Sequence, residues 1–303
     1  MAVTGINAIE TSFVNDYGTN LQLLSQQKLS RLRDTVTVQS FTGEGAAFIE
    51  QVGKAGSQKR TTRHGDTPLN PIPMDRRWVY PVDYDTADLI DNVDKLRMII
   101  DPKSAFARAQ ASALARDMDD EIIEGILVAN NTGKSGGTST SFDSNNAVAV
   151  GGTGLTIDKL RTIRELMEDN DVDFEMEPVC AIITPKQRTQ LLETTEITST
   201  DYNTVKALVN GDVDTFMGFK FIVSNRLLGA SKYNGAQTIT TNNERALFYP
   251  KSGVGLGIWQ EVSAQIDVRP DKRYSWQVYA SMTCGATRLE EAKVYSADTL
   301  TTA

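Results

Sequence analysis

The sequence predicts an α+β protein, because three different patterns follow one another along its 303 residues. An alanine-rich helical stretch covers about thirty residues, well beyond the usual three to four turns. A block that begins at Thr156 alternates helix-type with strand-type segments, as compact α/β units do. Two further segments between 258 and 284 show the period of two that is typical of β-strands.

The long helix is predicted over 102–131. Asp101 is a suitable N-cap acceptor, and Pro102 fits the first helical position, where its missing N–H costs nothing. Gly125 is the one weak position in its interior. At 1.5 Å per residue the helix would be roughly 40 Å long. Its packing stripe is expected to consist of residues four apart: Leu114, Met118, Ile122 and Ile126.

A long β-hairpin is predicted over 258–284, with its turn at 270–272. Apolar and polar residues alternate in both arms, and Gln260 interrupts the apolar set once. Each arm would be some 35 Å long at 3.3 Å per residue, nearly the length of the helix. We therefore expect the apolar stripe of the helix to face this hairpin.

The central block is predicted to be an α/β lobe. Its expected elements are a helix over Ile157–Asp169, a strand over Val179–Thr184, a helix from Pro185 to about Thr194 and a strand over Phe219–Val223. Gly133–Asn146, rich in Gly, Ser and Asn, is expected to be a surface loop.

The N-terminal part has little apolar sequence of its own. Residues 1–43, with a helix-compatible stretch over 19–33, are expected to form an arm that buries little. Short strands around 47–52 and 77–82 flank a long polar connection, of a length that is usually functional, disordered or ordered by a partner. Between Lys54 and Arg77, six bases oppose two acids, a local charge of +4.

Several enzyme classes are excluded by missing residues. His64 is the sole histidine, so no histidine metal pair or catalytic triad can exist. The segment 131–135 resembles a phosphate loop, but Val128 stands where its first glycine is needed. Gly253, Gly255 and Gly257 lack the third glycine of a dinucleotide site, so a turn before the hairpin is expected there. We predict no enzymatic activity, no cofactor and no metal, and a nucleotide-using enzyme is the least favoured alternative.

The net charge and the cysteines further limit the class of protein this can be. A net charge of −8 and a pI near 4.9 argue against a protein that mainly grips nucleic-acid phosphates. Cys180 and Cys284 lie in apolar runs and are expected to be buried free thiols. No apolar segment could span a membrane, and Glu10 and Asp16 interrupt any signal peptide, so we expect the chain to stay in the cytoplasm where it is made.

The order of arm, basic loop, long helix, α/β lobe and long hairpin resembles the major capsid proteins of tailed bacteriophages with the Hong Kong 97 fold. The resemblance rests on four segments: LSQQKLS at 24–30, RWVY at 77–80, GFKFIVSN at 218–225 and 274–288 with its GATR end. It implies an N-terminal arm (1–43), an extended loop (44–84), a peripheral domain (85–149, with the spine helix 102–131), an axial domain (150–257) and a peripheral hairpin with the C-terminal segment (258–303).

The resemblance also implies a function. The chain would assemble with itself, as hexamers and pentamers, into the icosahedral shell that encloses double-stranded DNA without sequence-specific contacts. A separate scaffolding protein is expected because the extended loop comes early in the chain. A portal protein and a possible decoration protein are the other expected partners. The protein would be part of the virion, assembled in the bacterial host cytoplasm. The alternative is the shell subunit of an encapsulin-like nanocompartment.

Charge suggests how such subunits join. Between Asp83 and Glu124 eleven acids oppose five bases, a local charge of −6 beside the basic loop. On the helix, four acids share one face, and a solvated or partner-facing stripe is more expected there than a metal site. We predict that the loop of one subunit lies across the peripheral domain of the next. The predicted interface residues are Lys54, Lys59, Arg60, Arg63, Arg76, Arg77, Asp117, Asp120, Glu121 and Glu124.

Overall fold

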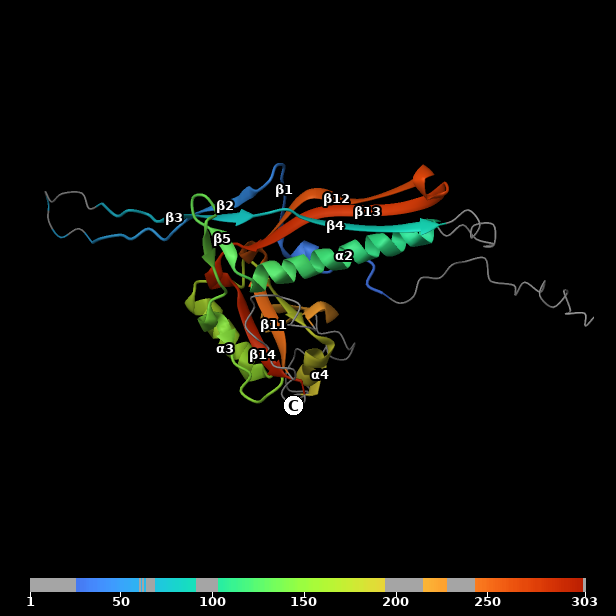
Figure 1. Ribbon diagram of the computed structural model, residues 1–303. Helices are drawn as coiled ribbons and strands as arrows, with labels where there is room; N and C mark the ends of the chain where they lie inside the picture. Colours follow the sequence, from blue (N-terminus) through green and yellow to red (C-terminus); the bar gives the residue numbers. More distant parts are fainter. Residues whose placement is uncertain are drawn as a thin grey trace, which may run out of the picture.

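The computed structural model describes residues 26–59, 61, 63, 69–90, 103–193, 215–227 and 243–301. These residues form three sheets. One sheet lies along the long helix α2, a second forms the lobe below it, and the third leads into a loop that projects away from the body (Figure 1).

The peripheral sheet contains the predicted hairpin. Its strand order is β1 (Thr37–Ser40), β12 (Val254–Arg269), β13 (Ser275–Arg288) and β4 (Val82–Ile90). β12 and β13 pair antiparallel from Val254 opposite Arg288 to Arg269 opposite Ser275, around a turn at Pro270–Lys272. The register shifts on both sides of Gln260, the residue that interrupts the apolar alternation. A β-bulge therefore absorbs the irregular position in the sequence.

Helix α2 (Lys103–Leu127) is shorter than the predicted 102–131. It ends at Leu127 because Asn130–Thr132 forms strand β5 instead. The Asn130 side chain donates to the carbonyl of Gly125 at 2.9 Å, which satisfies one of the last helical acceptors. The expected start at Asp101 and Pro102 lies outside the described residues.

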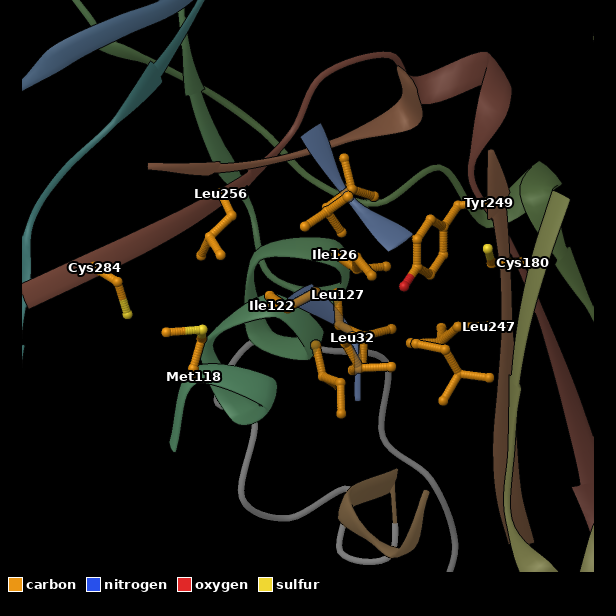
Figure 2. Close-up of a cluster of buried hydrophobic side chains, with 14 of the residues drawn as sticks. Leu32, Met118, Ile122, Ile126, Leu127, Cys180, Leu247, Tyr249, Leu256 and Cys284 are labelled. Carbon is orange, nitrogen blue, oxygen red and sulfur yellow. The ribbon is translucent and has the colours of Figure 1, made fainter. Parts of the chain in front are cut away.

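The apolar stripe of α2 packs on two sides. Leu114, Met118, Ile122 and Ile126 are at most 3% exposed. In Figure 2 Met118, Ile122 and Ile126 lie between Leu256 and Cys284 of the hairpin and Leu247 and Tyr249 of the lobe. Leu114 belongs to the same buried cluster. The stripe faces the hairpin as predicted, and it also forms the interface with the lobe.

The lobe is a six-stranded sheet covered by α3 (Ile157–Asp169) and α4 (Pro185–Glu193). Its strands, in spatial order, are β7 (Ala147–Val148), β14 (Tyr295–Leu300), β11 (Asn243–Pro250), β8 (Val179–Ile183), β10 (Phe219–Val223) and β9 (Thr215–Phe216). The predicted bounds of α3 and β10 are confirmed. β14 corrects the grouping of 258–303, because it pairs with β11 and β7 in the lobe rather than with the peripheral hairpin.

The expectation that residues 1–43 bury little is wrong for 26–43. Leu32 and Val36 are fully buried, and β1 pairs parallel with the start of β12. No α-helix forms over 26–33; a 3₁₀ turn, η2, covers Arg33–Thr35. The expectation failed because the partners of this segment lie far away in the sequence. Residues 1–25 lie outside the described part of the chain.

The extended loop begins as a two-stranded ladder of β2 (Ala46–Val52) and β3 (Met74–Val79). β3 ends earlier than predicted, and β4 starts after only Tyr80 and Pro81. β5 and β6 (Thr138–Thr140) continue this sheet, so 133–146 is not wholly a loop. The glycines at 255 and 257 lie within β12 rather than in a turn.

The two cysteines are buried free thiols, as predicted. Burial raises the pKa of Cys284 to about 12, so the thiol stays protonated and unreactive at neutral pH. Among the described helices none is long and apolar enough to cross a membrane. In the same residues no group of three or more His, Cys, Asp or Glu is placed to hold a metal ion.

Candidate subunit interface

The extended loop exposes apolar side chains as well as charges. Val52, Leu69 and Met74 are 62%, 92% and 78% exposed, on a segment that projects from the body (Figure 1). Exposed apolar residues on a projecting segment make this loop a candidate surface for contact with a partner. Leu69, between Pro68 and Pro71, and Met74, after Pro73, are the signal in the sequence that the predicted interface residues left out.

The six predicted basic residues of the loop have different environments. Lys59 and Arg63 are exposed, and Arg60 lies outside the described residues. Lys54 forms an ion pair with Asp171 of the lobe; the hydrogen bond raises the pKa of Lys54 and lowers that of Asp171. Both partners are largely exposed, so this ion pair contributes little to stability.

Two of the six predicted basic residues, Arg76 and Arg77, form ion pairs at the base of the loop. Arg76 pairs with Glu50 on the neighbouring strand and lies over the Trp78 ring at 5.8 Å. Arg77 is only 6% exposed and pairs with Glu291 at 3.3 Å. The expectation that Arg77 is available to a neighbour is wrong, because its guanidinium is part of the internal packing.

The acidic stripe on α2 is not a solvated face. Asp120 is 6% exposed and forms a two-pronged ion pair with Arg226 of the 3₁₀ turn η4 (Asn225–Leu227). Glu121 is 8% exposed and accepts a hydrogen bond from the Tyr84 hydroxyl at 2.7 Å. Asp117 and Glu124 are half-buried. The expectation of an outward stripe is wrong for Asp120 and Glu121, because η4 and β4 cover the helix there.

Burial shifts the pKa values of Glu121 and Tyr84. Desolvation raises the pKa of Glu121, and the nearby Glu124 raises it further, against the opposing hydrogen bond from Tyr84. Burial also raises the pKa of Tyr84, so its hydroxyl remains a donor. The two side chains line an open cavity of about 270 Å³ at the C-terminal end of α2.

The outward acids of the peripheral domain lie on β4 instead. Asp83, Asp85 and Asp88 are exposed on this edge strand, and Asp83 accepts from the Thr283 hydroxyl at 2.7 Å. The alternation in VDYDTAD places Val82 and Tyr84 on one face and Asp83 and Asp85 on the other, so the sequence indicated two of these acids. Asp88 lies on the face of Val82 and Tyr84, and the alternation does not predict its exposure.

Buried charges that the sequence analysis did not single out hold the parts of the chain together. The Asp119 carboxylate is fully buried in α2 and accepts from the backbone N–H groups of Arg31 and Leu32 at 3.1 and 3.2 Å. The Arg288 guanidinium donates to the carbonyls of Ile126 and Val128 and pairs with Glu291. Cationic donors at a helix C-terminus satisfy its free carbonyls and oppose its dipole.

Comparison with known proteins identifies the family to which this chain belongs and the structures that share its fold. Residues 9–300 match the family of phage capsid proteins. No curated protein sequence matches the chain. The fold resembles that of the cyanophage P-SCSP1u capsid, with a TM-score of 0.74, 18% identity, and coverage of 95% of this chain and 93% of that one.

Two further capsids agree with the chain over nearly their whole length. The cyanophage Pam1 capsid has a TM-score of 0.71 at 14% identity, with 99% of each chain covered. The capsid of Helicobacter pylori bacteriophage KHP30 has a TM-score of 0.71 at 12% identity, with 97% of this chain and 98% of that chain covered. The chain therefore belongs to the phage capsid protein family and has the Hong Kong 97 capsid fold.

Proposed function

We propose that this chain is the major capsid subunit of a tailed bacteriophage and builds the icosahedral shell that encloses double-stranded DNA. The observation that carries the proposal is the family match over residues 9–300. Full-length similarity to capsid structures supports it. Hexamers and pentamers, a separate scaffolding protein, a portal protein, a possible decoration protein and assembly in the host cytoplasm are parts of the same proposal. The family match weighs against the encapsulin-like alternative.

The test is expression of the full chain with and without the candidate scaffolding protein. Sedimentation and electron microscopy should reveal closed shells of uniform size, made of hexamers and pentamers. A stable small oligomer under all conditions would contradict the proposal. Shells that fill with one specific protein cargo instead of DNA would favour the encapsulin-like alternative.

We further propose that the subunits join through the basic loop and the acidic edge strand β4 of the next subunit. Lys59 has no hydrogen bond or ion pair within the described residues, and Asp85 and Asp88 are exposed. Opposite charges on two projecting edges favour a head-to-tail contact, which closes rings. Each exposed pair contributes only about 0.2–1 kcal/mol, but the contact is repeated over the whole shell. This pairing replaces the acidic stripe of α2 as the partner of the loop.

Charge reversal tests this contact. The loop variant K59E/R60E/R63E should remain a folded monomer and fail to form shells. Arg76 is left unchanged because it already pairs with Glu50. The strand variant D85K/D88K should fail alone and restore shells when combined with the loop variant, since the attraction returns with its sign exchanged.

Lys134→Glu, which reverses an exposed charge outside the loop, is the matched control and should assemble normally. Normal shells from the loop variant would contradict the contact while leaving the capsid function intact. Failure of the combined variant to assemble would contradict β4 as the partner.

A further inference from the structure

A cavity of about 480 Å³ lies between the N-terminal segment, the start of α4 and strand β10. Three basic side chains line it, Arg31, Arg188 and Lys220, with Asp34 as the acid among its lining residues. Its volume falls in the range of roughly 300–1,000 Å³ that is usual for small-ligand sites. An excess of positive charge in one hollow is unexpected in a chain whose net charge is −8.

Two of these cations are unpaired among the described residues. The side chains of Arg188, half-buried on α4, and Lys220, exposed on β10, have no hydrogen bond or ion pair with the residues that the structure describes. Like charges held close together repel one another. Asp34, the acid that lines the same cavity, forms no hydrogen bond or ion pair with them among the described residues. The convergence of the two cations on one cavity favours an anionic ligand.

The third cation is fixed in position. One guanidinium nitrogen of Arg31 donates to the carbonyl of Val223 at 2.6 Å, and its backbone N–H donates to the buried Asp119 carboxylate at 3.1 Å. A side chain held at both ends loses little further conformational entropy when it binds a ligand. The other guanidinium donors of Arg31 have no acceptor within the described part of the chain.

The place in the fold supports the same conclusion. β8 and β10 are parallel neighbours, and Val223, which lines the cavity, is the last residue of β10. α4 follows β8 directly, and Arg188 lies in its first turn. Ligands of α/β sheets bind outside the carboxyl ends of parallel strands, where the helix N-terminus adds positive potential. This arrangement is suited to phosphate.

We propose that this cavity is a phosphate-binding site and that its ligand is a backbone phosphodiester of double-stranded DNA. The choice of DNA rests on the proposed function, in which the shell encloses a DNA genome. The acidity of the rest of the chain keeps the interaction weak and dependent on salt, because only a few phosphates are neutralised for each subunit. Such a site contacts the phosphate backbone and reads no base sequence.

The test measures binding of a short fluorescent DNA duplex to the unassembled full chain by anisotropy, over a series of salt concentrations. The variant R188Q/K220Q should bind more weakly at low salt, and the slope of log K against log salt should fall by about one for each cation removed. The control K134Q/K272Q removes two exposed charges elsewhere and should leave both quantities unchanged. Equal losses in the two variants, or no loss in the first, would overturn the proposal.

Titration with inorganic phosphate, followed by calorimetry, distinguishes the source of the ligand. Phosphate should compete with the duplex for the wild-type cavity. Phosphate binding that disappears in R188Q/K220Q while DNA binding is retained would overturn DNA as the ligand. Shell formation by the same variant, imaged in parallel, separates the two proposals. Loss of DNA binding with normal shells supports the site, whereas a wild-type chain that binds DNA but never forms shells counts against the capsid function alone.

Discussion

Asp119 and Glu121 are two residues apart on α2, and both are buried, but their environments differ. Asp119 accepts two backbone N–H bonds and further bonds from the Gln27 and Ser30 side chains. Hydrogen bonds of this kind compensate the desolvation of a carboxylate. Glu121 accepts from the Tyr84 hydroxyl and from the backbone N–H of Ala286 and has Glu124 as a neighbour, and desolvation still raises its pKa, so these bonds do not fully compensate its charge.

The variant Glu121→Gln should therefore be more stable than the wild type at pH 7. The folded protein holds the pKa of Glu121 above the ordinary value of 4.5, so folding must bury an unfavourable charge at neutral pH. The amide removes that charge and can still accept from Tyr84. As the pH falls towards 4.5 from above, the folded wild type takes up its proton before the unfolded chain does. The difference in the free energy of unfolding should therefore shrink over this range and change no further below pH 4.5. Urea titrations of the unassembled wild type and variant, at pH 7 and at a pH below 4.5, measure this difference.

Glu165→Gln, on the exposed side of α3, is the control and should change the free energy of unfolding by less than about 0.5 kcal/mol at either pH. A wild type that is more stable than Glu121→Gln at pH 7 would show that the carboxylate is favourably paired after all.

Single residues were the hardest features to predict from the sequence. Spacing correctly placed Leu114, Met118, Ile122 and Ile126 on one buried stripe. It could not show that Asp120 and Glu121 are also internal, because helical periodicity says nothing about how many sides of a helix are covered. Their partners, Arg226 and Tyr84, are distant in sequence.

Among the elements, the contact of α2 with β13 depends on a position with no side chain. A Cβ on Gly125 would lie 2.7 Å from the carbonyl carbon of Ala286, and one on Gly285 would lie 2.1 Å from the carbonyl oxygen of Tyr80. Real Cβ atoms do not approach backbone atoms so closely. The weak helical position seen in the sequence is therefore what lets the helix and the strand approach each other.

Gly125→Ala should destabilise the chain even though alanine is the better helix former. The gain in helix propensity is about 1 kcal/mol, whereas forcing a methyl group against backbone costs roughly 1–3 kcal/mol. Thermal unfolding of the unassembled chain measures the net loss. Gly56→Ala, where a Cβ would meet nothing within 4 Å, is the control. A rise in melting temperature for Gly125→Ala would refute the close-approach argument.

Local signals predicted the elements that are stabilised locally. Thr156 caps α3 by accepting from the backbone N–H of Lys159, so the start of this helix is set by its own sequence, and its bounds were predicted correctly. β1 and β14 were missed because each is short and pairs with strands far away in the sequence. β5 was missed because it is only three residues long and pairs with the equally short β6 and, at Thr132, with the distant β3. Pairing with a distant strand produces no recognisable alternation of apolar and polar residues within such a short segment.

At the scale of the whole molecule, the lobe and the peripheral domain share one buried cluster. Cys180 and Ile182 of β8 point into the cluster that contains α2 and the hairpin, whereas Ala181 and Ile183 belong to the cluster under α3. β8 is therefore buried on both faces, and the expected boundaries between domains do not divide the core. We expect the two parts to unfold together.

Ile126→Ala tests this cooperativity. The side chain is fully buried, so its truncation should cost about 2–5 kcal/mol. Hydrogen exchange followed by mass spectrometry should show protection lost in β8 and β11 as much as in β12 and β13. Leu29→Ala, at a position that is 77% exposed, is the control and should change neither the free energy of unfolding nor the protection of these strands. Loss confined to the peripheral strands would show two independently unfolding units.

The short step from β3 to β4 has a mechanical consequence. Only Tyr80 and Pro81 separate the strand that ends the extended loop from the strand that edges the peripheral sheet. A pull on the loop is therefore transmitted along covalent backbone into β4, and then sideways through the ladder to β13. In a shell under internal pressure, tension between subunits would load these ladder bonds in shear along the strands, with many bonds resisting at once, rather than peel them apart one by one.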